Sequence, residues 1–261
     1  RRPKQMEAEP THNLPENVEK ALVELKAVLG DEWATADDAV TCGYARDQGF
    51  KHCIYPDIIV LPGSTEDVAA VFRIANKYLI DVMPYGTGCN TVGLTIPLYG
   101  GIIMDGRRMD KILALDKDNM YARVQPGVNY CMLQAEALKL GLRVANPSAP
   151  ATVSVVSNHL FCNINTMASK FGFGMDNVIE AQVVLPTGEV LEMGPRASGM
   201  DPAQVAGFGP DTSNLLRFAM GTLGYVTEMT IRLYSAPAVD LEFYPAYPDD
   251  DLTDLIEALY R

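Results

Sequence analysis

The first periodic pattern in the chain is helical. Apolar residues recur every three or four positions over residues 15–30, PENVEKALVELKAVLG. The predicted buried stripe consists of Val18, Leu22, Leu25 and Val28. Gly30 follows as a stop signal. The pattern therefore predicts one amphipathic helix near the N-terminus.

Residues 57–86, DIIVLPGSTEDVAAVFRIANKYLIDVMPYG, predict a strand, a helix and a second strand. Ser64 or Thr65 can cap the helix, and the acidic residues after them favour its N-terminus. The predicted buried stripe of this helix is Val68, Val71, Phe72, Ala75 and Leu79. Together these elements form one βαβ unit.

A glycine-rich loop, PYGTGCNTVG at residues 84–93, ends this unit. A dinucleotide-binding fold of the Rossmann type needs a helix directly after its glycines. Here the chain continues with LTIPLYGGIIMD, whose last four residues, 102–105, predict a strand. The Rossmann interpretation therefore fails, and the loop offers a row of backbone N–H groups that suits a pyrophosphate.

The second half of the chain alternates strands with one helix. Residues 121–125 predict a strand, Asn129 caps a helix, and Gly141 ends it before a short strand. Residues 178–193 predict a hairpin that turns at residues 186–189. A long strand follows, with one face formed by Tyr225, Thr227, Met229, Ile231 and Leu233. The fold class expected from this order is α+β.

The last segment predicts a strand, VDLEFYPAY, and an amphipathic helix, DDDLTDLIEALYR. The apolar stripe of that helix is Leu252, Leu255, Ile256 and Leu259. Such a stripe needs a surface to pack on, and nothing in the sequence after it supplies one. We therefore expect the chain to be a fragment or one subunit of a larger assembly.

Composition narrows the class of protein. The chain has 261 residues, 48% hydrophobic and 21% charged, with a net charge of −12. This charge argues against a nucleic-acid partner, and no apolar run reaches the ~18 residues of a membrane span. Five cysteines and three histidines show no metal-ligand or disulfide spacing. With no signal peptide at the start, we expect a cytoplasmic protein without a metal site.

Five segments in series resemble the FAD-binding domain of the vanillyl-alcohol oxidase / p-cresol methylhydroxylase (PCMH-type) family. That family includes D-lactate and glycolate oxidases and alkyl-dihydroxyacetone-phosphate synthases. The segments lie between about residues 55 and 235 and read PDIIVLPGSTEDVAAVFRIANKY, MPYGTGCNTVG, GGIIMDGRRMDKILALDKDNMYARVQPGVNYCMLQAEALKLGL, VVLPTGEVLEMG and GTLGYVTEMTIRL. A single glycine motif is a weak signal, but five matching segments in the order of the family are a strong one.

The resemblance implies a PCMH-type fold in which two α+β subdomains hold one FAD between them. It divides the chain into an N-terminal helical segment (1–50), the FAD-binding domain (51–236) and the truncated start of a cap domain (237–261). Within the FAD-binding domain the expected subdomains are about 51–110 and 111–236.

The resemblance also implies the residues that contact FAD. The glycine loop is expected to wrap the pyrophosphate through Pro84, Tyr85, Gly86, Thr87, Gly88, Cys89, Asn90 and Thr91. The segment NPSAPATVSVVSN matches a second flavin loop, with candidates Pro147, Ser148, Thr152, Ser154, Ser157 and Asn158. Val226 matches a position whose backbone meets the adenine end of the cofactor.

Three departures leave the substrate branch open. Ser157 and Asn158 stand where the hydroxy-acid oxidases usually carry two glycines, and Met220 stands where glutamate is common. The segment 207–216, GFGPDTSNLL, is closer to the phenol-oxidising and ether-lipid branches.

Two of the single residues allow two interpretations each, and the others allow one. Cys89 is either a covalent attachment point for the flavin or, as we favour, a small residue beside the phosphates. His159 either faces the flavin or is a hydrogen-bonded core residue, and we favour the core. Tyr225 is expected in the core. Asp105, Arg107 and Arg108 are expected to be solvated.

The functional prediction is an FAD-dependent oxidoreductase that oxidises an alcohol, phenolic or 2-hydroxy-acid substrate by hydride transfer to flavin N5. The alternatives are an FAD-carrying electron-transfer subunit, a reductase like UDP-N-acetylenolpyruvoylglucosamine reductase that uses NADPH, and a scaffold that has lost FAD. No catalytic residue can be named. The expected partners are a small-molecule substrate and either further copies of the chain or other subunits.

Overall fold

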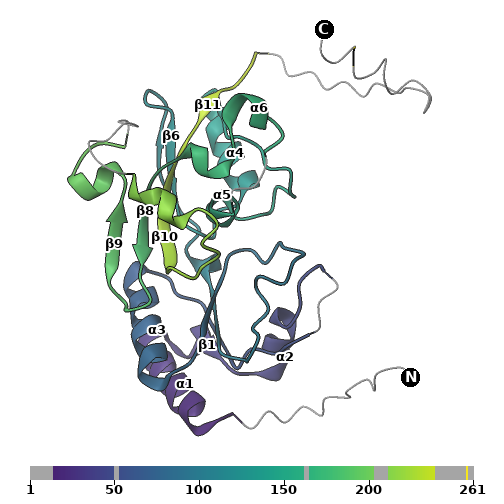
Figure 1. Ribbon diagram of the computed structural model, residues 1–261, viewed down its shortest axis with the longest axis vertical. Coiled ribbons are helices and arrows are strands. Elements are labelled where there is room, and N and C mark those ends of the chain that lie inside the picture. The colour runs from purple at the N-terminus through teal and green to yellow at the C-terminus, as the bar shows by residue number, and fades with distance from the viewer. Residues whose placement is uncertain (1–13, 50–52, 162–164, 203–210, 239–256, 258–261) are drawn as a thin grey trace.

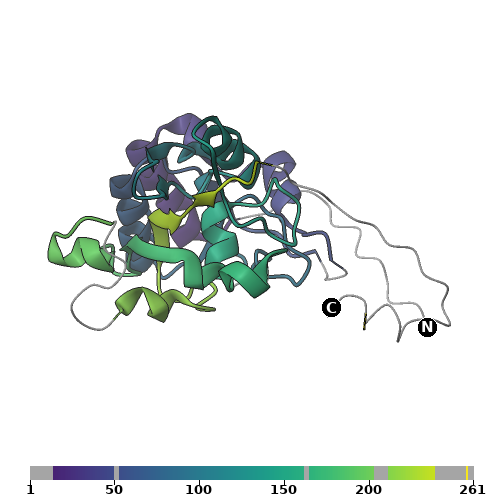
Figure 2. The ribbon, with the colours of Figure 1, turned by 90° about the horizontal axis from the view of Figure 1, so that it is seen from above.

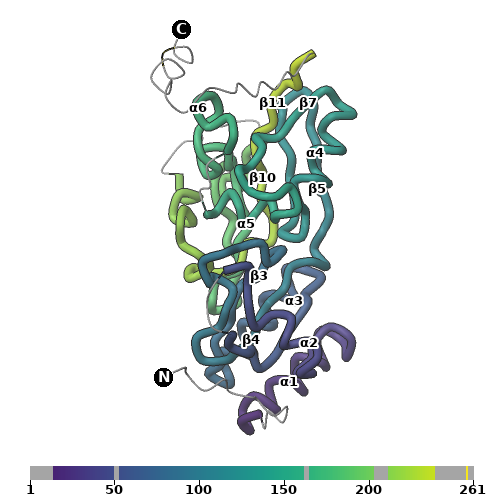
Figure 3. The backbone as a smooth tube through the Cα atoms, turned by 90° about the vertical axis from the view of Figure 1, so that its right-hand side faces the viewer, coloured from purple at the N-terminus to yellow at the C-terminus, as the bar shows by residue number. Residues whose placement is uncertain are grey.

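The structure is a computed structural model that describes residues 14–49, 53–161, 165–202, 211–238 and Glu257. It consists of two α+β units stacked along the longest axis, with the N-terminal unit below the other in Figure 1. A view from the side shows the same stacking (Figure 3).

The N-terminal unit contains a mixed four-stranded sheet with the order β1-β2-β4-β3. Strands β2, β4 and β3 are parallel, and β1 runs antiparallel to β2. Their bounds are β1 Ala34–Thr35, β2 Ile58–Val60, β3 Val82–Tyr85 and β4 Ile102–Asp105. The helices are α1 Glu16–Leu29, α2 Asp38–Thr41 and α3 Thr65–Tyr78. Helices α1 and α3 lie side by side on the sheet (Figure 1).

The C-terminal unit contains a five-stranded antiparallel sheet with the order β5-β6-β10-β8-β9. The bounds are β5 Ile112–Asp116, β6 Tyr121–Val124, β8 Val178–Val184, β9 Val190–Met193 and β10 Tyr225–Arg232. A short pair, β7 Leu142–Arg143 and β11 Tyr234–Ser235, lies beside it. The helices are α4 Tyr130–Lys139, α5 Val155–Leu160 and α6 Ala168–Phe171.

Short 3₁₀ helices connect these elements. They are η1 Asp31–Trp33, η2 Cys42–Tyr44, η3 Gly106–Arg108, η4 Gly174–Asn177, η5 Pro195–Ser198 and η6 Thr212–Leu216. Seen from above, the yellow end of the chain, which includes β10 and β11, crosses the middle of the molecule (Figure 2).

The α+β class is confirmed, and most elements predicted from the sequence are present. Ser64 caps α3 by accepting from the backbone N–H of Asp67, and Asn129 caps α4 by accepting from that of Met132. The hairpin β8–β9 turns through Pro186–Glu189, where the N–H of Leu185 donates to the carbonyl of Glu189. No helix directly follows the glycine loop, as expected.

Two stripe residues were placed wrongly. Val28 is 50% exposed, because the buried face of α1 runs through Val18, Ala21, Leu25 and Leu29. Leu79 is 90% exposed, because α3 ends at Tyr78 and Leu79 is its left-handed C-cap with φ 55°. A residue past the last turn no longer follows the helical period, so it leaves the buried face.

Strand β10 is buried on both faces, not on one. Val226 and Thr230 are buried together with the predicted Tyr225, Met229 and Ile231. The strand lies in the centre of the sheet, and two irregularities in its pairing with β8 interrupt the strict alternation.

The strand and helix predicted at 239–247 and 249–261 fall outside the described residues, apart from Glu257. Within the described ranges, no helix has the length and apolar character needed to cross a bilayer.

Candidate functional site

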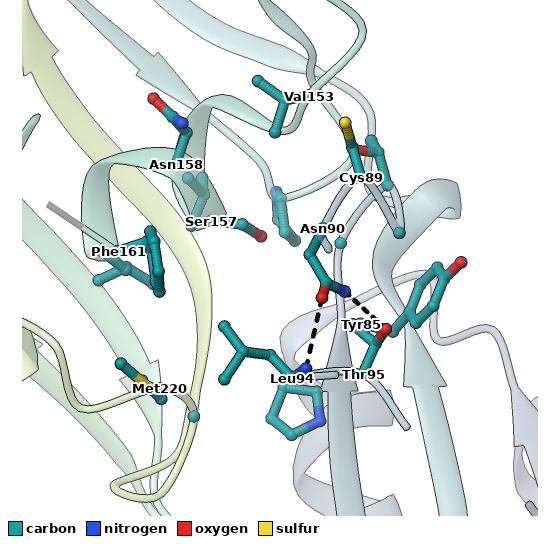
Figure 4. Close-up of a pocket in the computed structure, with 18 of the residues that line it drawn as sticks. Tyr85, Cys89, Asn90, Leu94, Thr95, Val153, Ser157, Asn158, Phe161 and Met220 are labelled. Carbon is teal, nitrogen blue, oxygen red and sulfur yellow. Dashed lines mark hydrogen bonds between the residues drawn. The ribbon is translucent and has the colours of Figure 1, made fainter. Parts of the chain in front are cut away.

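A cavity of about 460 Å³ lies where the two units meet, a size within the ~300–1,000 Å³ usual for ligand sites. The glycine loop from the N-terminal unit forms one wall (Figure 4). The second predicted loop with α5, and the segment leading into β10, form the rest. The lining therefore joins three segments that lie far apart in the sequence.

Most of the predicted contact residues lie in this lining. They are Pro84, Tyr85, Gly86, Thr87, Gly88, Cys89, Asn90, Thr91, Ser148, Ser157, Asn158 and Val226. The lining does not include Pro147, Thr152 or Ser154. Direct contact of any of these residues with FAD stays a prediction.

Two glycines are needed for the shape of the first wall. Gly88 has φ +71°, and a Cβ there would lie 1.9 Å from the hydroxyl of Tyr85. A Cβ on Gly86 would lie 2.4 Å from the Oγ of Ser157, in the other unit. The loop therefore folds over Tyr85 and lies against α5, and a side chain at either position would force Tyr85 or Ser157 to move.

The side chain of Asn90 holds the rest of the loop in place. Its Nδ2 donates to Thr95 Oγ1 at 2.8 Å, and its Oδ1 accepts from the N–H groups of Val92, Gly93 and Leu94 at 3.2–3.3 Å. Figure 4 shows two of these bonds as dashed lines. Asn90 thus uses its amide to hold the loop in shape, so its Oδ1 and Nδ2 are already engaged within the protein.

Backbone donors remain free at the turn. The N–H groups of Thr87, Gly88, Cys89 and Thr91 donate to none of the described residues. Successive free N–H groups in a turn form a concave anion site. The described lining contains no Lys, Arg, Asp or Glu, so nothing there repels a pyrophosphate and these donors fit one.

Ser154, the N-cap residue of α5, joins the second wall to the first. The Oγ of Ser154 accepts from the N–H of Ser157 at 3.2 Å and donates to the carbonyl of Pro126 at 2.6 Å. The N–H of Ser154 donates to Thr87 Oγ1 at 2.9 Å. Ser154 therefore connects the two walls from behind the lining.

The cavity also has an apolar part that sequence reasoning missed. Val153, Val156, Leu160 and Phe161 come from α5 and its flanks, and Met220 faces them from the segment before β10. The ring of Phe161 packs edge-on against Phe218, with centroids 5.7 Å apart. A flat aromatic ring system suits such a surface. The helical spacing from Val153 to Phe161 was the signal available for finding this stripe.

The other missed lining residues come mostly from loops. They are Gln48, Val92, Leu94, Thr95, Pro126, Ala149, Pro150, Gly221, Gly224 and Tyr225.

The two residues with two interpretations, and Tyr225, can now be placed. His159 is 1% exposed, and its Nδ1 lies 2.7 Å from the carbonyl oxygen of Val155, so the core interpretation is confirmed. Tyr225 is buried as expected but also lines the cavity. Cys89 is a half-buried free thiol that lines the cavity and packs on the apolar core of the C-terminal unit.

The expectation that Asp105 is solvated was wrong. Its side chain is 0% exposed, accepts from the Tyr44 hydroxyl at 2.8 Å and from Arg107 Nε at 2.7 Å. The ring of Tyr44 packs edge-on against Tyr85, with centroids 5.0 Å apart. Asp105 is the last residue of β4, paired with Tyr85, so this ion pair supports the start of the glycine loop.

Arg107 and Arg108 are also engaged. The side chain of Arg107 is 54% exposed but pairs with Asp105. Arg108 stacks on Trp33, its Cζ 3.8 Å from the ring centroid, and donates to the carbonyl of Leu61 at 2.8 Å.

The described lining holds few groups that titrate. Its only ionisable side chains are those of Tyr85, Tyr225 and Cys89. Burial raises the pKa of both tyrosines, which keeps them neutral. Among the described residues, no cluster of three or more His, Cys, Asp or Glu could hold a metal ion.

Comparison with known families and sequences gives consistent matches. The family described as "FAD binding domain" matches residues 56–194. The chain is 31% identical over 221 residues to a probable mitochondrial D-lactate dehydrogenase of Danio rerio, covering 84% of this chain and 44% of the relative. It is 33% identical to a D-lactate dehydrogenase of Anaerostipes hadrus, covering 85% and 45%. It is 28% identical to the glycolate oxidase subunit GlcD of Bacillus subtilis, covering 90% and 50%. The chain thus spans about half the length of these relatives.

Solved structures show the same fold. A p-cresol methylhydroxylase with substrate bound superposes with a TM-score of 0.80 at 24% identity, covering 95% of this chain and 49% of that one. An alkyldihydroxyacetonephosphate synthase superposes with a TM-score of 0.75 at 25% identity, covering 88% and 42%.

Proposed function

The chain belongs to the FAD-linked oxidoreductases that share the FAD binding domain, and from this membership we propose that it oxidises an alcohol, phenolic or 2-hydroxy-acid substrate. The predicted family, the PCMH-type fold and the cofactor FAD are confirmed by these matches. The observation that carries the proposal is the glycine loop, which lies within the matched residues, lines the cavity and has backbone N–H groups that donate to none of the described residues.

The two walls suggest a division of labour in holding FAD. The N–H groups of Thr87, Gly88 and Cys89 are proposed to bind the pyrophosphate, since they donate to none of the described residues and the described lining contains no acidic side chain. The apolar stripe with Leu160 and Phe161 is proposed to pack on the isoalloxazine ring. When bound, FAD supplies a hydride acceptor at its N5 atom.

Hydride transfer from a C–H bond beside a hydroxyl also needs a group that takes the hydroxyl proton. The only ionisable side chains in the described lining are those of two tyrosines and one cysteine. Since the pKa of Tyr85 and of Tyr225 is raised, neither is a suitable base at neutral pH. We therefore propose that the base comes from outside the described lining.

The substrate proposal starts from a D-2-hydroxy acid. Two relatives are D-lactate dehydrogenases by name, and a third is a glycolate oxidase subunit. A phenolic substrate is the rival, because the cavity is apolar near Phe161 and Met220 and one structural neighbour is a p-cresol methylhydroxylase.

The experiment is anaerobic reduction of the FAD-loaded protein, followed by loss of visible flavin absorbance. D-Lactate, L-lactate, glycolate, 4-ethylphenol and NADPH are added in separate reactions. Bleaching by D-lactate or glycolate supports the proposal in its first form, and bleaching by 4-ethylphenol supports the phenolic form. Bleaching by NADPH alone would contradict both and favour a reductase.

A second candidate is an FAD-carrying electron-transfer subunit whose partner supplies the substrate site. The observation that favours it is the lack of any acidic, basic or histidine side chain in the described lining. If so, the FAD-loaded chain is reduced by dithionite but by none of the organic donors until a second polypeptide is added.

The boundaries of the domains stay proposals, with subdomains at about 51–110 and 111–236 and the start of a cap domain at 237–261. A cytoplasmic location and a homo-oligomeric or multi-subunit state are also proposals. Two of the relatives are mitochondrial by name.

A further inference from the structure

The amide of Asn158 has one engaged end and one free end. Its Oδ1 accepts from the Tyr130 hydroxyl at 2.9 Å. Its Nδ2 donates to none of the residues that the structure describes. Asn158 is only 7% exposed and lines the cavity beside Ser157 (Figure 4). A buried amide that lines a cavity with its donor unused is suited to an acceptor on a ligand.

The neighbouring His159 determines which way the Tyr130 proton points. Its Nδ1 lies 2.7 Å from the carbonyl oxygen of Val155, which can only accept, so Nδ1 carries a proton. The same Nδ1 lies 3.1 Å from the Tyr130 oxygen, which therefore cannot donate to it. Hence the hydroxyl proton of Tyr130 goes to Asn158 Oδ1.

The ring of His159 is neutral, because burial lowers its pKa to about 4. The proton order is thus fixed at neutral pH: Nδ1–H of His159 faces Val155, Tyr130 donates to Asn158, and Nδ2 of Asn158 has no acceptor among the described residues. A flipped amide would place Nδ2 against Tyr130 and leave the buried hydroxyl proton without an acceptor. The network therefore permits one orientation of the amide.

We propose that Asn158 donates a hydrogen bond to an acceptor atom of the isoalloxazine ring of FAD, and that Tyr130 and His159 are the positioning residues that keep its Nδ2 turned to the cavity. The ring is the part of FAD concerned because Asn158 lies on α5 with Val156 and Leu160, which belong to the apolar part of the lining together with Phe161, the C-cap of α5. The inference rests on FAD as the cofactor and adds two residues, Tyr130 and His159, that do not line the cavity.

A donor at a ring acceptor interacts differently with oxidised and reduced flavin, because reduction adds electron density to the ring oxygens and a hydrogen to N5. Loss of the donor should therefore shift the reduction potential of bound FAD. A residue that merely supports the fold would change the melting temperature without changing that potential.

The test compares three variants of the full chain loaded with FAD. Asn158→Ala removes the donor, and Tyr130→Phe removes the hydroxyl that orients it. Tyr234→Phe is the matched control, because the Tyr234 hydroxyl also donates to an asparagine Oδ1, that of Asn177, outside the cavity lining. For each protein the FAD dissociation constant, the visible spectrum, the reduction potential and the melting temperature are measured.

We expect Asn158→Ala to bind FAD about tenfold more weakly, which corresponds to about 1.4 kcal/mol, with a shifted potential and a shifted spectrum. Tyr130→Phe should change the potential and spectrum in the same direction by a smaller amount. Tyr234→Phe should leave both as in the parent protein, whatever it does to the melting temperature.

Two results would count against the account in different ways. If the parent chain binds FAD and Asn158→Ala keeps its potential and spectrum, the inference fails while the cofactor stands. If the parent chain takes up no FAD, the cofactor assignment itself fails. Should Tyr130→Phe not fold, the potential of Asn158→Ala still decides the role of the donor.

Discussion

At Gly88 the backbone and a side chain compete for the same space. Its φ of +71° and the 1.9 Å between a hypothetical Cβ and the Tyr85 hydroxyl show two separate reasons for glycine. Gly141 has nearly the same angle, φ +72°, but open space around it. A substitution at Gly141 therefore tests backbone strain alone, whereas the same substitution at Gly88 also displaces the loop.

Gly88→Ala should weaken FAD binding by about tenfold or more, because the added methyl moves either Tyr85 or the free N–H groups beside it. Gly141→Ala should cost roughly 1–2 kcal/mol of stability from the left-handed backbone and leave FAD affinity unchanged. Isothermal titration with FAD and urea unfolding measure the two effects. Equal FAD affinity in both variants would show that the loop tolerates the change.

His159 gives the molecule a pH-dependent term in its stability. Its pKa is about 4 in the folded protein because of burial, against about 6.5 in the unfolded chain. Between these values the unfolded state binds the proton and the folded state does not. The contribution is fully present above pH 6.5 and is lost as the pH falls toward 4.

The measurement is the free energy of unfolding against pH, for the parent chain and for His159→Gln. The parent should lose more stability than the variant between pH 6.5 and 4, by about 3 kcal/mol at most. Parallel curves would mean that His159 titrates normally. The comparison cancels the other groups that titrate in this range.

Among the elements, the end of β4 shows what an ion pair with a buried carboxylate does here. Asp105 pairs with Arg107 and Tyr44, and through Tyr44 it supports Tyr85 at the end of β3. The ion pair of Lys77 with Glu24 joins α3 to α1, with 58% and 37% of the two side chains exposed. Buried and exposed pairs differ in how much removal of one partner costs.

Asp105→Asn should destabilise the chain by about 2 kcal/mol, because it leaves donors of Arg107 and Tyr44 poorly matched. It should also weaken FAD binding, since Tyr85 loses part of its support. Glu24→Gln is the matched control and should change neither property measurably. Urea unfolding and FAD titration of both variants are the measurements, and equal behaviour would contradict a role for Asp105 beneath the loop.

Several elements were predictable from local signals, and the exceptions have local causes. The cap at Ser64, the cap at Asn129 and the hairpin turn at 186–189 depend on neighbouring residues, so the sequence predicts them. The solvated reading of Asp105 failed because its partner Tyr44 lies 61 positions away. Charge alone suggests exposure, and only tertiary structure reveals the buried pair.

For the molecule as a whole, the cavity depends on both units. The free N–H groups come from the N-terminal unit and the apolar stripe from the C-terminal unit. Sequence analysis found the loops through a family resemblance. It did not place Phe161, Met220 and Tyr225 in the lining of the cavity, because the approach of distant segments is not visible in local patterns.

Because FAD would contact both units, it should stabilise the folded chain by mass action. At a free concentration one hundred times its dissociation constant the gain is about 2.7 kcal/mol. Thermal melting with and without FAD measures it, with riboflavin as the control that lacks the pyrophosphate. A melting temperature that rises equally with riboflavin would argue against the N–H groups of Thr87, Gly88 and Cys89 as the phosphate site.

The central claim is that the cavity between the two units holds one FAD. The most direct measurement is the visible spectrum of the purified chain, repeated after titration with FAD and after acid precipitation. The account predicts flavin bands that saturate at one FAD per chain and leave with the supernatant, since Cys89 is expected to remain a free thiol. Flavin that stays with the pellet would instead show covalent attachment, with Cys89 as the first position to test. A chain that is colourless and takes up no FAD would contradict the account.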